Sequence, residues 1–64
     1  MGKPIHLEVS VTPPADGDGW VVDVCLLSGR SGRYGRTEAP FVEDAFKEAL
    51  LIALASEPYP RDHA

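Results

Sequence analysis

Apolar and polar residues alternate without a break over residues 5–11. The odd positions are all aliphatic: Ile5, Leu7, Val9 and Val11. The positions between them are polar: His6, Glu8 and Ser10. A period of two indicates a strand with one buried face, because successive side chains of a strand point to opposite sides. The pattern therefore predicts a first strand over residues 5–11.

A second apolar run, WVVDVCLL, covers residues 20–27. One face of this predicted strand is fully apolar and is expected to be buried: Trp20, Val22, Val24 and Leu26. The other face is half apolar: Val21, Asp23, Cys25 and Leu27. Such a pattern is typical of a central strand or of a strand with partners on both faces. The intervening segment 12–19 has two prolines and two Asp-Gly pairs, which predict a loop between antiparallel neighbours.

A glycine-rich turn over residues 28–32 is followed by a weaker strand pattern over residues 33–38. Gly35 stands in the middle of this third segment, and glycine weakens a strand because it has no side chain to pack.

Residues 41–55, FVEDAFKEALLIALA, have the pattern of a helix. Thr37 is the expected N-cap, and Pro40 is expected in the first turn. Glu43 and Asp44 complement the positive end of the helix dipole. Pro58 cannot continue a helix, so the helix is expected to end just before it.

The two halves of this helix differ in character. Its first half keeps four charges on one side: Glu43, Asp44, Lys47 and Glu48. Residues 50–55 carry no charge at all. Because one sheet covers only one stripe of a helix, the remaining apolar stripe needs a second partner. The alternative is that the tail folds back over the leucines, with Tyr59 and its flanking prolines as a lid.

These elements predict an α+β fold: a three-stranded antiparallel β-meander followed by one C-terminal helix packed on one face. The chain has 64 residues, which allow a single small domain over 1–64. Residues 58–64 are expected to form a flexible tail. A domain of this size is only marginally stable alone, and one cysteine excludes an internal disulfide, so oligomerisation is the most available source of extra stability.

Charge and hydropathy narrow the function classes. The net charge is −4, which argues against a general binder of nucleic acid or membrane surfaces. No segment approaches the roughly 20 apolar residues of a membrane span, and the N-terminus lacks the apolar core of a signal peptide. We expect a cytoplasmic protein without a cofactor, a metal site or a membrane partner.

Two segments carry a resemblance to a known family: residues 18–22 (DGWVV) and residues 42–50 (VEDAFKEAL). With the order of elements around them, they resemble the small sheet-and-helix domain of HicB-like antitoxins. The Pro-Gly-Cys element that such domains often carry after the second strand is absent, and residues 28–30 (SGR) stand there. The separate C-terminal DNA-binding segment of many members has no counterpart. The resemblance implies the fold and, for the role, the masking of a small toxin by an oligomer.

No catalytic motif is present, so the leading hypothesis is a non-catalytic protein-interaction module. It would block or adapt a protein target, as an antitoxin or a phage-encoded inhibitor does, and assemble as a homodimer. The expected interface is the apolar side of the helix or the outer face of the sheet: Leu50, Leu51, Leu54, Val21, Cys25 and Leu27.

The second hypothesis is a nucleic-acid-binding module built on the segment SGRSGRYGRT. This segment holds the basic cluster and an aromatic side chain: Arg30, Arg33, Tyr34 and Arg36. Arginines contact phosphates and tyrosines stack on bases. The simpler interpretation is a solvated hairpin tip, and an acidic protein surface is a further possible partner for it.

The third hypothesis is thiol chemistry or metal binding at His6 and Cys25. A register that pairs Val11 with Trp20 would place these two side chains opposite each other, and would also set Glu8 against Asp23. A thiolate beside an imidazole is a starting point for nucleophilic catalysis or metal binding. A flat sheet face, however, offers neither a pocket nor oxyanion donors.

Overall fold

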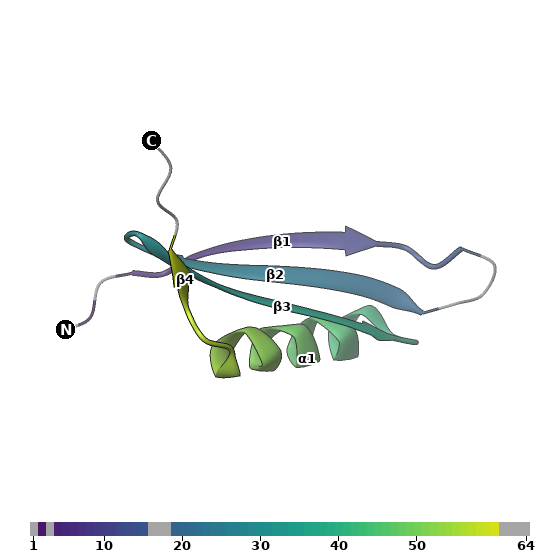
Figure 1. The fold of residues 1–64 in the computed structure, drawn as a ribbon. Helices are drawn as coiled ribbons and strands as arrows, with labels where there is room; N and C mark the ends of the chain where they lie inside the picture. Colours follow the sequence, from purple (N-terminus) through teal and green to yellow (C-terminus); the bar gives the residue numbers. More distant parts are fainter. Residues whose placement is uncertain (1, 3, 16–18, 61–64) are drawn as a thin grey trace.

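The computed structural model describes residues 2, 4–15 and 19–60, and it has two layers, a sheet and a single helix (Figure 1). The elements are β1 (His6–Thr12), β2 (Trp20–Ser28), β3 (Ser31–Ala39), α1 (Val42–Ala55) and β4 (Tyr59–Pro60). The sheet is antiparallel with the order β1-β2-β3-β4. The α+β prediction is confirmed, and the sheet has four strands where three were predicted, because the short β4 joins the meander.

The register of β1 on β2 differs by two residues from the one considered above. Val11 pairs with Val22, and Glu8 pairs with Cys25. His6 stands opposite Leu27. The expected juxtapositions of His6 with Cys25 and of Glu8 with Asp23 are therefore wrong. This register aligns the aliphatic side chains of β1 with those of β2 on one side of the sheet.

The core lies between β2, β3 and α1. Its buried side chains come in equal shares from the second strand and the helix: Val22, Val24, Leu26, Ala45, Ala49 and Ala53. The predicted buried face of β2 is thus confirmed, with Trp20 partly buried against it. The helix contributes only alanines to this core, so it lies close to the sheet.

Gly35 is the position that permits this close approach. A Cβ atom added at Gly35 would lie 2.2 Å from the carbonyl oxygen of Ala49 and 2.5 Å from the backbone nitrogen of Ala53. Both atoms belong to the helix backbone, which cannot rotate away as a side chain can. The glycine that weakens the third strand pattern is therefore required by the packing of α1 on β3.

The helix begins at Val42 after Phe41, which provides no side-chain cap. The predicted N-cap is wrong: Thr37 lies inside β3, and its hydroxyl donates to Glu48 Oε1 at 3.3 Å. Pro40 precedes the helix instead of standing in its first turn. At the other end, Ser56 Oγ donates to the Ala53 carbonyl oxygen at 2.8 Å, which satisfies one of the free carbonyls of the last turn.

Strand β1 pairs with β2 along one edge, but no element among the described residues packs on its apolar face. The helix packs on β2 and β3, as Figure 1 also shows. A helix is about 10 Å wide and strands are about 4.8 Å apart, so one helix covers about two strands. The expectation that Ile5, Leu7, Val9 and Val11 are buried is therefore wrong, since all four are exposed.

The short strand β4 places Tyr59 on the face of the sheet that points away from the helix. Tyr59 pairs with Gly32, and a Cβ atom at Gly32 would lie 2.7 Å from its ring. Its hydroxyl oxygen lies 3.0 Å from Cys25 Sγ. Tyr59 thus does not serve as a lid over the leucines, and Leu54 stays 52% exposed. The sequence pattern does not foresee β4, and residues 61–64 lie outside the described part of the chain.

Candidate protein-binding surface

The aliphatic face of β1 is exposed although it lies beside the core. Its four aliphatic side chains are between 41% and 56% exposed: Ile5, Leu7, Val9 and Val11. They lie on the same side of the sheet as α1, because Val9 pairs with the buried Val24 and Leu7 with the buried Leu26. We call these four residues the β1 face.

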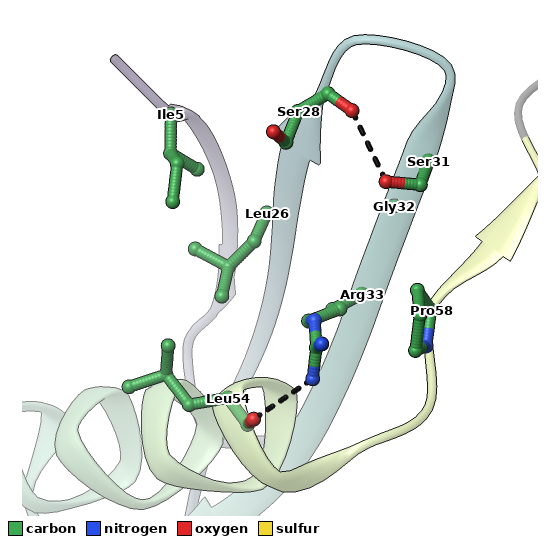
Figure 2. Close-up of a pocket in the computed structure, with 8 residues that line it drawn as sticks. All are labelled: Ile5, Leu26, Ser28, Ser31, Gly32, Arg33, Leu54 and Pro58. Atoms are coloured by element: carbon green, nitrogen blue, oxygen red, sulfur yellow. Dashed lines mark hydrogen bonds between the residues drawn. The ribbon is translucent and has the colours of Figure 1, made fainter. Parts of the chain in front are cut away.

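A flank of the helix continues this apolar surface. Phe46, Leu50 and Leu54 are spaced four residues apart and so share one side of α1. Phe46 and Leu50 are half-buried against the core, whereas Leu54 is exposed. Figure 2 shows Leu54 directed toward Leu26 and Ile5, which places this flank on the side of β1. The β1 face and this flank together form the β1–α1 surface.

A hollow of about 470 Å³ marks one end of the β1–α1 surface (Figure 2). Its lining combines apolar side chains with small polar ones: Ile5, Leu26, Ser28, Ser31, Gly32, Arg33, Leu54 and Pro58. The charged group in this lining, the Arg33 guanidinium, is already engaged. Its Nη1 donates to the Leu54 carbonyl at 3.1 Å and to the Ser56 carbonyl at 2.6 Å. The hollow thus presents mainly apolar surface, which fits a contact site for a protein side chain.

The leucines predicted as an interface do not form one patch. Leu50 and Leu54 belong to the β1–α1 surface. Leu51 is two positions from the buried Ala49, roughly half a turn around the helix, so it points away from the sheet. It is 54% exposed.

The other predicted interface residues lie on the opposite, outer face of the sheet. Val21, Cys25 and Leu27 alternate along β2 with the buried core residues, and each is half-buried. The structure therefore divides the predicted interface between two surfaces. Only the helix side adjoins the β1 face.

The outer face carries a polar network around Asp23. The Tyr34 hydroxyl donates to Asp23 Oδ1, and Arg36 Nε lies 3.6 Å from the same oxygen. The hydrogen bond to Asp23, with a smaller contribution from desolvation, raises the pKa of Tyr34 above its ordinary value, and the nearby Arg36 opposes that shift. Asp23 and Tyr34 line a second hollow of about 460 Å³ together with Glu8, Ser10 and Cys25.

The third hypothesis requires His6 beside Cys25, and the structure separates these two residues. The neighbour of the Cys25 sulfur is the Tyr59 hydroxyl, and the register places His6 opposite Leu27. Among residues 2, 4–15 and 19–60, no group of three or more His, Cys, Asp and Glu side chains is arranged to hold a metal ion.

The arginines of the second hypothesis do not converge on one surface. Arg33 lies on the helix side of β3 and satisfies carbonyls at the end of α1. Arg36 lies on the outer face beside Asp23. Arg30 is exposed in the turn between β2 and β3. Two of the three therefore have partners within the fold.

Sequence reasoning missed the β1 face as a candidate site. The period of two predicts a strand with one buried face, but the structure leaves that face exposed. The available signal was the number of elements, because one helix cannot cover three strands.

Comparisons of the chain with models of known protein families, with curated proteins and with solved structures gave no match. The resemblance to HicB-like antitoxins therefore stays a prediction. Within the described ranges, no helix has the length and apolar character needed to cross a membrane.

Proposed function

We propose that this chain is a small, non-catalytic protein-binding module that acts by surface contact. Its binding surface is the β1–α1 surface, and its role is to block or adapt a protein target, as an antitoxin or an inhibitor does. Assembly as a homodimer is part of this proposal.

One observation carries the proposal: four adjacent aliphatic side chains of β1 remain 41–56% exposed beside the exposed Leu54. Single exposed apolar residues are common on monomers, but a contiguous group of them is typical of an interaction site. The geometry of the hollow in Figure 2 supports the same role, since it is lined mainly by apolar groups. Arg33 Nη1 is engaged by the Leu54 and Ser56 carbonyls, so the apolar groups dominate the contact surface of the hollow.

The direct test is affinity capture from the native host with matched surface variants. Leu7→Lys places a charge in the β1–α1 surface, and Arg36→Ala is the control that changes the outer face of the sheet. We expect a protein that is retained by the wild type and by Arg36→Ala, and that is lost at least tenfold with Leu7→Lys. Both variants should keep the circular dichroism of the wild type, because both positions are exposed.

Equal retention by the two variants would contradict the proposed surface. Loss with Arg36→Ala alone would move the site to the outer face of the sheet. A captured nucleic acid whose retention falls steeply with salt would favour the arginine hypothesis instead.

A further inference from the structure

The sheet has two edges, and they are protected very differently. The edge at β3 is partly paired by β4 and carries three charged side chains, Arg33, Arg36 and Glu38. Charged side chains on an edge strand discourage pairing with another chain. The edge at β1 has seven residues with a single carboxylate, Glu8, and no proline or glycine. Within the described residues, β1 pairs on one side only, with β2.

We propose that β1 pairs antiparallel with β1 of a second copy of this chain, so that two sheets become one continuous sheet around a two-fold axis. This inference rests on the proposed function and specifies how its homodimer forms. The pairing satisfies the outward backbone groups of both edge strands. It also sets the two β1 faces side by side, each next to a helix of its own copy.

Side-chain parity restricts the register of this pairing. In an antiparallel two-fold pair, the numbers of facing residues add to a constant. The two-fold axis passes between a residue and the same residue of the second copy, so the sum is twice that residue number and is even. An even sum puts all the aliphatic side chains on the helix side of the joint sheet. The strand pairs best about residue 8 or residue 9, near its centre.

Charge selects between these two centres. Pairing about Glu8 would set the two Glu8 carboxylates directly opposite each other, and like charges that face each other destabilise a sheet. Pairing about Val9 sets Glu8 opposite Ser10 of the second copy, whose hydroxyl can donate to a carboxylate. It also sets Leu7 opposite Val11. The expected register is therefore centred on Val9.

The subunit exposes more surface than a compact monomer of its mass. A folded monomer of 6.9 kDa is expected to expose about 4,000 Å², whereas this chain exposes 4847 Å². The flat shape of the subunit, 40 × 29 × 16 Å, accounts for the excess in geometric terms, and edge pairing is the arrangement that extends a flat sheet.

The register can be read by disulfide trapping in a Cys25→Ser background. Facing residues of an antiparallel pair have Cα atoms about 4.5–5.5 Å apart, within the range of a disulfide. Val9→Cys should cross-link to itself under mild oxidation, and a mixture of Leu7→Cys with Val11→Cys copies should form the mixed dimer. Glu8→Cys reports the alternative centre, and Leu51→Cys reports a helix-to-helix interface. All five single cysteines replace exposed residues, and circular dichroism checks each fold.

We expect Val9→Cys to give at least fivefold more covalent dimer than Glu8→Cys or Leu51→Cys, and the Leu7→Cys and Val11→Cys mixture to give more heterodimer than either homodimer. Dominant cross-linking through Glu8→Cys would overturn the Val9 register. Dimers that cross-link only through Leu51→Cys would overturn β1 pairing and leave the proposed homodimer standing. A chain that stays monomeric and cross-links at no position would overturn this inference, and target binding would then depend on the capture experiment alone.

Discussion

Val9 and Val24 are the same residue type, face each other across β1 and β2, and lie on the same side of the sheet. Val24 is fully buried, and Val9 is 41% exposed. The difference does not come from the strands, because both have aliphatic residues at alternate positions. It comes from the single helix, whose width covers β2 and β3 and leaves β1 beyond its reach.

This contrast shows what an alternating pattern can predict. It identifies the apolar face of a strand, but it does not show whether another element packs on that face. On β2 and β3, α1 packs closely on the apolar face, because its three alanines and Gly35 leave room for the close approach. On β1 the four aliphatic side chains stay exposed, and we propose that a contact outside the subunit covers them. The predictions below probe the two halves of the sheet, beginning with the covered one.

Substitution of Gly35 should have the largest effect on the covered half. In Gly35→Ala, the new Cβ overlaps backbone atoms of α1, so the helix must move away from the sheet. We expect a loss of about 3 kcal/mol in the free energy of unfolding, measured by urea denaturation. Gly29→Ala is the matched control: its φ of +60° is unfavourable for alanine, but no atom lies within 4 Å, so the expected loss is about 1 kcal/mol. Equal losses would show that α1 does not pack closely on β3.

The two facing valines give the direct measure of the contrast. Val24→Ala removes two methyl groups from the core and should cost about 2 kcal/mol through lost burial and a residual cavity. Val9→Ala should cost about 0.5 kcal/mol when the protein is dilute enough to be monomeric. Unfolding in urea at low protein concentration measures both values. Comparable costs in the dilute monomer would mean that the β1 face is covered within one subunit.

Two long-range hydrogen bonds from Arg33 reach the end of the helix. Arg33→Ala leaves the carbonyls of Leu54 and Ser56 without their side-chain donor, so we expect a loss of about 1 kcal/mol. Arg36→Ala removes an ion pair with a well-exposed side chain and should cost less than about 0.5 kcal/mol. Thermal unfolding of the two variants side by side provides the measurement, and the reverse ranking would argue against the role assigned to Arg33.

The titration of Tyr34, on the outer face of the sheet, should have the smallest effect on stability. The hydrogen bond to Asp23 raises the pKa of Tyr34 in the folded state. The folded chain therefore holds the tyrosine proton more tightly than the unfolded chain does. Its contribution to stability is present below the unfolded pKa of about 10 and is lost as the pH rises through the folded pKa. An NMR titration with ring-labelled tyrosine should place the midpoint of Tyr34 above 10, and Asp23→Ala should lower it. An unchanged midpoint in that variant would remove the hydrogen bond as the cause.

Much of the fold follows from local pattern. Periodicity and turn residues predict the three main strands, their antiparallel order and the helix that ends before Pro58. The start of the helix could not be predicted in this way. Thr37 is a typical N-cap residue, but its place in β3 depends on the pairing of nine β3 residues with β2, which only the tertiary structure defines. Likewise, Tyr59 joins the sheet because Gly32 leaves room for its ring, a relation between positions 27 residues apart in the chain.

The candidate site was predicted less well than the fold. The sequence identifies Leu50 and Leu54 as surplus apolar residues, and the structure leaves Leu54 exposed. It misses the β1 face because burial of a strand depends on how many elements lie above it, and that number is a property of packing. It also joins Arg33 and Arg36 into one cluster, although alternation along β3 sends them to opposite faces.

The central claim is that one subunit leaves the β1 face open as a contact surface for a second copy. Sedimentation equilibrium over a hundredfold range of concentration tests it most directly, with Val9→Lys beside the control Leu51→Lys. We expect a concentration-dependent dimer for the wild type, a similar dimer for Leu51→Lys, and a monomer for Val9→Lys at every concentration. A wild-type chain that stays monomeric throughout, or a Val9→Lys variant that dimerises as the wild type does, would contradict it.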